Sequence, residues 1–343
     1  MTILAIDIGA TNTRIGLFSN DGKSIWLKRV KTSEAVNYEP AGEAIPKLII
    51  NTLKEAVENS EIHSDDLRSI EAIGIGCIGP IDFRLGIIKH APNLPSKLKD
   101  VDINIVKPLA KYFKKPTYMV NDCVAAVYGE KIFGTGRNYE NLVYITISTG
   151  IGGGVIIDDN LIFGKDGNAH EVGHIVIDKD AVLTCGCGGK GHWEAYCSGS
   201  GIPNYVEYLI SNKLVKSLSS ESQLYQQYLK TGKVSARELY HYAKMGDELA
   251  LEIVWNVGKL NAIGVASVIN VYDPEIVILG GAVVLNNEEL VIKPINQYVN
   301  DYVMNRLAEI EVTRLRDEVV LYGALAIALE PPRKLRQVME KLW

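Results

Sequence analysis

The chain has few cysteines and no run of basic residues, and these shortages already argue against several classes of protein. Five cysteines in 343 residues do not make a disulfide framework and favour a reducing cytoplasm. The formal net charge of −5 comes with no basic cluster, which argues against non-specific binding to nucleic acid or to a membrane surface. We also expect no apolar run of membrane-spanning length.

What is present is typical of a soluble globular protein of more than one domain. Hydrophobic residues make up 47% and charged residues 22% of the chain. A length of 343 residues suits two α/β lobes, each with its own core. The first six residues lead directly into Asp7 as a strand, so we expect no signal peptide.

One pattern occurs twice, which predicts two related α/β halves. In the first half, strands near 3–8 and 13–18 enclose the loop Gly9-Ala10-Thr11-Asn12. In the second half, strands near 142–148 and 154–158 enclose a loop that contains Thr149 and Gly150. Because both loops are rich in glycine, their backbone amides are open to an anion. We therefore expect both loops to hold one anionic ligand in a cleft.

The segment from Thr117 to Phe133 is the centre of this organisation. Residues 117–121 are apolar and β-branched and predict a short buried strand, and Asp122 then opens a helix that stops near Gly134. Open α/β sheets bind ligands at such strand-to-helix junctions. Taken alone, an Asp at this junction is better explained as a helix N-cap.

The remainder of the chain is mainly helical. Helices are expected near 202–211, 247–270, 290–306 and 319–329, and an amphipathic tail near 333–343. A buried strand near 275–279 runs into Gly280-Gly281.

The sequence excludes two familiar nucleotide loops and offers a third. Neither the P-loop pattern nor the complete dinucleotide fingerprint is present. The Asp7-x-Gly9-x-Thr11 pattern supplies phosphate donors and a carboxylate that can hold Mg²⁺ through water, although alone it is better explained as a plain turn. With the second loop and the Gly-Gly pair, it resembles the phosphate and adenosine motifs of the actin, hexokinase and heat-shock ATPase superfamily. The candidate ATP-binding residues are Asp7, Gly9, Ala10, Thr11, Asn12, Thr149, Gly150, Gly280 and Gly281.

Further motifs narrow the resemblance to one family. Gly74 to Asp82, Pro92-Asn93-Leu94, Asn121-Asp122, His170-Glu171-x-Gly173-His174 and the segment Cys185 to Glu194 follow in this order. In that order they resemble the ROK family of repressors and sugar kinases, from Ile3 to about Ala328. The resemblance implies a two-lobed actin/hexokinase-like (ribonuclease H-like) α/β fold with ATP and sugar in the interlobe cleft. The expected small lobe is 1–121 plus about 319–343, and the large lobe is 122–318 with a helical segment at 196–270.

The resemblance also implies roles for individual residues. Asp122 would be the general base that takes the proton from the sugar hydroxyl. The other residues implied to bind the sugar are Asn93, Asn121, Glu171, His174 and Glu194. A cleft lined with carboxylates and amides can pair the many hydroxyls of a hexose with fixed geometry.

The family's zinc motif is present with one departure. His174, Cys185 and Cys187 match it, but His192 stands where the family has a third cysteine. Imidazole is a good Zn²⁺ ligand, so we expect a structural site with two histidines and two cysteines. The alternatives are a metal-free loop and Cys197 as the fourth ligand.

The predicted activity is ATP-dependent phosphorylation of glucose and related hexoses to the 6-phosphate, with ATP, Mg²⁺ and structural Zn²⁺. An N-acetylmannosamine or N-acetylglucosamine kinase fits the same residues. A repressor of the same family is disfavoured because only six residues precede Asp7, where those proteins carry a DNA-binding domain. A non-sugar ATPase would not need the Asn121-Asp122 pair. We expect a cytoplasmic protein without nucleic-acid or membrane partners, and the resemblance implies a homodimer or larger homo-oligomer.

Overall fold

The computed structural model describes residues 2–91 and 93–342, so Pro92 of the Pro92–Leu94 motif lies outside the described residues, as do Met1 and the last residue of the tail. The chain divides into two compact units. Unit 1 comprises the described residues of Met1–Asn138, Gly154–Ala169 and Glu318–Trp343, and unit 2 comprises Tyr139–Gly153 and His170–Asp317. The helix that begins at Asp122 is thus grouped with unit 1, whereas the predicted lobe boundary precedes it.

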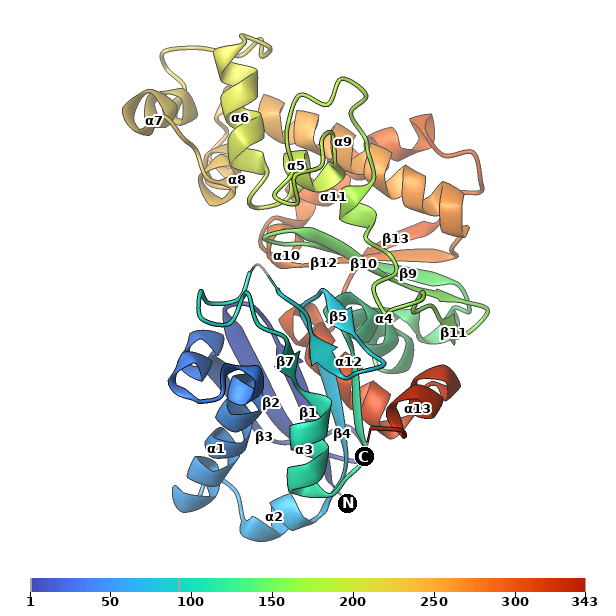
Figure 1. The fold of residues 1–343 in the computed structure, drawn as a ribbon. Helices are drawn as coiled ribbons and strands as arrows, with labels where there is room; N and C mark the ends of the chain where they lie inside the picture. Colours follow the sequence, from blue (N-terminus) through green and yellow to red (C-terminus); the bar gives the residue numbers. More distant parts are fainter. Residues whose placement is uncertain (1, 92, 343) are drawn as a thin grey trace. The chain divides into compact units, whose positions relative to one another are not determined.

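Unit 1 is built on a five-stranded sheet in the order β3-β2-β1-β4-β8. Figure 1 labels β1, β2, β3 and β4 of this sheet. The first three strands form an antiparallel meander, and β4 and β8 extend it in parallel on the other side of β1. Parallel neighbours place their carboxyl ends at one edge of the sheet. The strands are β1 (Thr2–Ile8), β2 (Asn12–Ser19), β3 (Ser24–Lys31), β4 (Ile70–Cys77) and β8 (Thr117–Asn121), with a small separate sheet of β5 (Ile81–Asp82), β6 (Ile87–Ile88) and β7 (Ile103–Asn104).

The helix α12 (Val319–Leu329) is the central core element of unit 1. It packs against α4 (Asp122–Ile132) and against β1 and β4. The close approach depends on small residues, because a Cβ atom at Gly74 would overlap the backbone carbonyl of Ala324. The other helices of the unit are α1 (Ala44–Glu58), α2 (Ser64–Arg68), α3 (Val106–Phe113), α13 (Arg333–Met339), η1 (Thr32–Asn37), η2 (Ala41–Glu43) and η3 (Thr135–Asn138). A short 3-10 helix, η6 (Arg316–Glu318), lies where the chain passes from unit 2 into α12.

The second sheet has the order β11-β10-β9-β12-β13, and its strands β9 and β12 run parallel in unit 2. Its strands are β9 (Leu142–Ile147), β10 (Ile151–Ile157), β11 (Asn160–Leu161), β12 (Ile276–Gly280) and β13 (Glu309–Val312). The sequence pattern did not indicate β13, because only its backbone pairing with β12 distinguishes it from a polar loop.

After Trp193 unit 2 is mainly helical, as predicted. Its helices are η4 (Val172–His174), α5 (Trp193–Cys197), α6 (Ile202–Ser211), α7 (Gln223–Thr231), α8 (Ala236–Lys244), α9 (Glu248–Tyr272), α10 (Ala282–Asn286), α11 (Glu288–Tyr298) and η5 (Val299–Asp301). The predicted helix 290–306 is wrong at its end. The chain leaves the α-helix after Tyr298 because the next segment turns back to α9, where the Met304 amide donates to the Asn270 side chain over 2.8 Å.

The helix α9 is the core helix of unit 2 and packs on α5, α8 and α11. Its 25 residues are long and apolar enough to cross a membrane by length and composition, so the expectation that no such segment occurs was wrong. However, 61% of its most apolar stretch is buried inside the structure. Burial of this extent is typical of the core helix of a globular domain.

Candidate functional site

The first predicted phosphate loop is the tight connection between β1 and β2 in unit 1. The Gly9 amide donates to the carbonyl of Asn12 over 3.0 Å, which closes the turn. Thr32, at the start of η1, holds this turn with two hydrogen bonds. Its hydroxyl donates to the Gly9 carbonyl over 2.7 Å, and its amide donates to the Thr11 carbonyl over 3.0 Å. Ala10 and Thr11 stand at the tip of this supported loop.

Asp7 lies at the base of that loop and is ion-paired. It is 6% exposed, and its Oδ2 atom accepts from Nη1 of Arg14 over 2.8 Å. The two residues face each other across the β1–β2 ladder. The sequence reasoning missed Arg14, although the hairpin register counted back from Gly9 and Asn12 would have placed it opposite Asp7. The residue predicted to hold Mg²⁺ therefore has a fixed carboxylate.

Asn121 and Asp122 stand at the junction of β8 and α4, as predicted. The N-cap of α4 is Asn121, whose Oδ1 atom accepts from the Cys123 amide over 2.9 Å. Asp122 shares that amide through its own Oδ1 atom over 2.8 Å. The alternative that Asp122 is the N-cap is thus wrong, and Asp122 lies in the first turn, at the positive end of the helix dipole.

Asp7, near the end of β1, and Asp122, directly after β8, lie at the same edge of the first sheet, with only β4 between the two strands. The thiol of Cys77, the last residue of β4, is influenced by both carboxylates. Burial raises the pKa of the Cys77 thiol, and the negative charges of Asp122 and then Asp7 raise it further. Asn168 is a further residue that sequence reasoning missed: its side chain bonds both backbone groups of Ile81, at 2.9 and 2.7 Å, and fixes the loop that follows β4. Asn93, in contrast, lies in an exposed turn of unit 1.

The second predicted phosphate loop connects β9 and β10 in unit 2. It is closed by the Ser148 amide, which donates to the Gly150 carbonyl over 2.8 Å. Gly280 is the last residue of β12, the parallel neighbour of β9, and Gly281 follows it. A Cβ atom at Gly281 would overlap the carbonyl of Ile147, and its φ of +87° requires glycine. The two glycine-bearing segments therefore lie side by side at one sheet edge.

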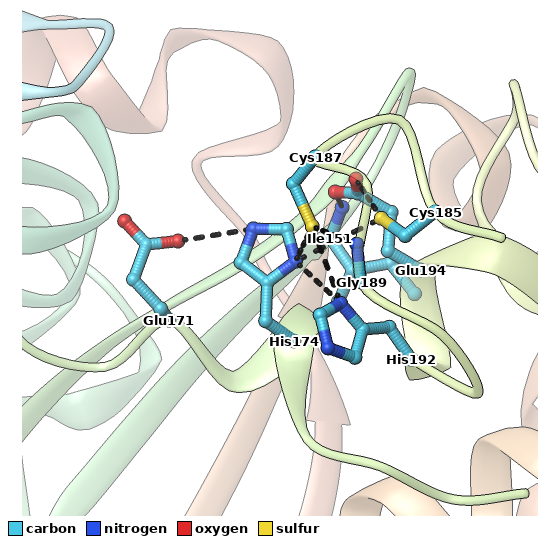
Figure 2. Close-up of polar contacts among 8 residues, drawn as sticks. All are labelled: Ile151, Glu171, His174, Cys185, Cys187, Gly189, His192 and Glu194. Carbon is cyan, nitrogen blue, oxygen red and sulfur yellow. Dashed lines mark hydrogen bonds and ion pairs between the residues drawn. The ribbon is translucent and has the colours of Figure 1, made fainter.

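Four side chains of unit 2 form a group that could hold a metal ion. The ligand atoms of His174, Cys185, Cys187 and His192 all lie within 4.8 Å of one another (Figure 2). Both imidazoles turn Nδ1 inward, and the two Nδ1 atoms are 3.3 Å apart. Sγ of Cys187 lies 3.6 Å from Nδ1 of His174 and 3.3 Å from Nδ1 of His192. Two thiols and two imidazoles are a donor set that suits Zn²⁺. Cys197, the alternative ligand, is completely buried with its Sγ atom 3.6 Å from the carbonyl of Val257.

Two carboxylates flank this group. The Oε2 atom of Glu171 lies 3.6 Å from Nε2 of His174. The pKa of Glu171 is raised above its usual value. Partial burial is the main cause, His174 acts in the opposite direction, and the negative charge of Glu194 raises the pKa further. The side chain is still 56% exposed. The Glu194 carboxylate accepts hydrogen bonds from the Cys185 thiol over 3.3 Å and from the Ile151 amide over 2.8 Å. Glu171, His174 and Glu194 are thus brought together in unit 2.

The predicted site residues divide between the units. Unit 1 holds the Asp7 loop, Asn93, Asn121 and Asp122, and unit 2 holds the Thr149 loop, the Gly-Gly pair, the metal-ligand group and its flanking carboxylates. That both sets act on one substrate remains a prediction.

Comparison with known proteins covers nearly the whole chain. A sequence model of the ROK family matches residues 3–331. A glucokinase of Pyrobaculum calidifontis is 36% identical over 334 residues, which is 97% of each protein.

Solved structures agree with this family. A ROK hexokinase from Thermus thermophilus superposes with a TM-score of 0.73 at 27% identity and covers 96% of this chain and 98% of its own. A ROK family glucokinase from Streptomyces griseus, in complex with glucose and AMPPNP, gives a TM-score of 0.71 at 26% identity over 96% of this chain and 99% of its own. The predicted fold class is confirmed.

Proposed function

This chain belongs to the ROK family, and we propose that it is an ATP-dependent glucokinase that transfers the γ-phosphoryl group of ATP to the 6-hydroxyl of glucose. The observation that carries the proposal is its full-length similarity to glucokinases, one of them solved with glucose and an ATP analogue. The Asn121-Asp122 junction, an acid beside a capping amide at a sheet edge, supports the same conclusion.

The chemical step falls to Asp122. Its carboxylate accepts the proton of the sugar hydroxyl while that oxygen forms a bond to the γ-phosphorus, and the bond between this phosphorus and the bridging oxygen of ADP breaks. Since phosphoryl transfer depends mainly on alignment and charge stabilisation, Asp122 acts chiefly by orienting the hydroxyl. Its bond to the Cys123 amide fixes the carboxylate for that purpose.

The nucleotide is held by the two glycine-bearing loops. Gly9 to Asn12 and Thr149-Gly150 offer backbone amides and threonine hydroxyls to the phosphates, and Gly280-Gly281 leaves room for the adenosine. Asp7 would hold the Mg²⁺ ion of MgATP through water, and that ion would neutralise charge on the β- and γ-phosphates. The ion pair with Arg14 holds the Asp7 carboxylate in one position.

Residues of both units bind the sugar in this proposal. Asn93 and Asn121 come from unit 1, and Glu171, His174 and Glu194 come from unit 2. Their amide, imidazole and carboxylate groups match the mixed donors and acceptors of a hexose. Closure of the units on the sugar would exclude water that could otherwise hydrolyse ATP.

The metal has a structural role in this proposal. His174, Cys185, Cys187 and His192 would fill all four positions of a tetrahedral Zn²⁺ ion, which leaves none for substrate. The ion would fix the ring of His174, whose other nitrogen faces Glu171. We further propose a homodimer or larger homo-oligomer in the cytoplasm.

A coupled assay across a sugar panel tests the proposal. Purified protein is given MgATP with glucose, mannose, fructose, N-acetylglucosamine or N-acetylmannosamine, and ADP release is followed. The proposal predicts the highest kcat/KM with glucose. Turnover of only the N-acetyl sugars would assign the protein to the N-acetylhexosamine kinases instead.

A further inference from the structure

The turn that follows α5 contacts the second phosphate loop along its length. The Gly199 amide donates to the Ser148 carbonyl over 2.7 Å. The next carbonyl, that of Thr149, accepts twice from Ser200: from its amide over 3.2 Å and from its hydroxyl over 2.7 Å. Two consecutive carbonyls of the loop are therefore held by two consecutive residues of the turn.

Glu194, on α5 itself, holds the other end of the loop. Its Oε2 atom accepts from the Ile151 amide over 2.8 Å. A Cβ atom at Gly150 would overlap this carboxylate, so the loop backbone lies directly against it. Figure 2 shows the Glu194 side chain between Ile151 and the Cys185 thiol. The loop is thus held at both ends by one short segment, residues 194–200, which we call the loop clamp.

The loop clamp is itself anchored in the core of unit 2. Trp193 is completely buried, and its indole nitrogen donates to Oδ1 of Asn261 on α9 over 2.8 Å. Its ring lies against Gly264, where a Cβ atom would overlap it. The Ser198 hydroxyl donates to the Glu194 carbonyl over 2.7 Å and closes the end of α5. Contacts of the clamp therefore fix the loop relative to the core helix.

We propose that Glu194 and Ser200 are positioning residues for the nucleotide: they hold the loop Ser148–Ile151 so that the Thr149 and Gly150 amides face the phosphates before ATP binds. The inference rests on the proposed function, because it assigns the loop to ATP. It gives Glu194 a task on the nucleotide side besides its proposed contact with the sugar. Donors that are ordered in advance need no reorganisation when the ligand binds, which is why loss of the clamp weakens binding.

Ser200 offers the cleanest test, since it is exposed and has no proposed contact with sugar or metal. Ser200→Ala removes the hydroxyl's bond to the Thr149 carbonyl, together with its 3.2 Å contact with the Ser198 hydroxyl, and is expected to raise the KM for ATP and the Kd for AMPPNP by about 2- to 10-fold. The KM for glucose should stay unchanged. Ser200→Thr, which retains the hydroxyl, should restore most of the affinity. The matched control is Ser211→Ala, which removes a serine hydroxyl that bonds Tyr228 elsewhere in unit 2.

Glu194 is tested with a pair of variants. Glu194→Gln retains an acceptor oxygen for the Ile151 amide, whereas Glu194→Ala does not, so the Kd for AMPPNP in the absence of sugar should rise about 10-fold or more only in the alanine variant. Glu252→Ala is the control, because Glu252 also accepts backbone amides, those of Lys216 and Ser217, but far along the chain from the loop. Zinc content, measured by mass spectrometry, should be unchanged in the Ser200 variants.

The outcomes separate this inference from the proposed function. If wild type binds AMPPNP but Ser200→Ala and Glu194→Ala bind it equally well, the inference is wrong and the proposed function stands. If wild type binds no ATP analogue, the assignment of the loop to ATP is wrong and the proposed function fails with it. A weaker affinity for glucose alone in Ser200→Ala would also overturn the inference.

Discussion

The Nε2 atom of His174 lies 3.6 Å from the Oε2 atom of Glu171, while the Nδ1 atom of the same ring lies among the thiols of Cys185 and Cys187. One imidazole thus faces a candidate metal position with one nitrogen and a candidate sugar ligand with the other. A metal ligand whose second nitrogen is held by a carboxylate has a fixed ring and a fixed tautomer. In the proposed function, a metal ion bound here would therefore fix the ring of a sugar-binding residue without touching the sugar itself.

Metal removal is therefore predicted to impair sugar binding. His192→Ala leaves three ligands and should lower the zinc content well below one ion per chain, whereas His192→Cys should retain the metal. Zinc stoichiometry and the KM for glucose would be measured for both variants. His241→Ala, which changes a histidine of α8 outside the ligand group, is the control. Full zinc content in His192→Ala would show that His192 is no ligand.

Arg14 is predicted to act through Asp7. Arg14→Met leaves the buried carboxylate without its 2.8 Å partner and should raise the Mg²⁺ concentration needed for half-maximal activity several-fold. Arg14→Lys keeps the charge and should recover part of the effect. The measurement is a Mg²⁺ titration at saturating ATP and glucose, with Arg68→Met, which alters an exposed ion pair, as the control. An unchanged Mg²⁺ dependence in Arg14→Met would contradict this role.

The packing of α12 on β4 gives a test of the fold alone. Gly74→Ala would place a methyl group on the Ala324 carbonyl and should lower the free energy of unfolding by about 1–3 kcal/mol. Glu71→Ala, at an exposed position of the same strand, should change it by less than about 0.5 kcal/mol. Urea denaturation of both variants is the measurement. Equal stabilities would mean that α12 does not lie against β4 as described.

The ionisation of Asp178, in the loop that leads to Cys185, should make the stability of the protein depend on pH. Burial opposes ionisation, but the Tyr196 hydroxyl and the amides of Val182 and Asp180 lower the pKa of Asp178 below its usual value. A carboxyl whose pKa is depressed in the folded state adds stability above its unfolded pKa and loses it as the pH falls through the folded pKa. Asp178→Asn should thus be less stable than wild type at neutral pH. Thermal unfolding from pH 7 to pH 3 should show the two converge, and a constant difference would contradict the assignment.

Much of this architecture was predictable because it depends on local signals. The strand before Asn121, the helix after Asp122 and the two glycine-bearing loops follow from apolar spacing and turn residues. The group of His174, Cys185, Cys187 and His192 was implied by the resemblance to the family's zinc motif, and the four side chains do lie together. The prediction of an ATP-dependent sugar kinase agrees with the glucokinase relatives.

What could not be predicted depends on contacts between distant segments. The pairing of Arg14 with Asp7 needs the hairpin register, and the two bonds of Asn168 to Ile81 join residues 87 positions apart. The end of α11 at Tyr298 is set by contacts with α9, not by any helix-breaking residue at that point. The loop clamp needs the tertiary fold as well, because Ser200 and Thr149 are 51 positions apart.

The most direct measurement follows the phosphorus of ATP by ³¹P NMR with glucose, Mg²⁺ and either wild type or Asp122→Ala. Wild type should convert the γ-phosphate signal to glucose 6-phosphate in step with ADP, and Asp122→Ala should bind glucose and ATP but turn over at least about 100-fold more slowly. Release of inorganic phosphate without a sugar phosphate, or undiminished turnover by Asp122→Ala, would contradict the account.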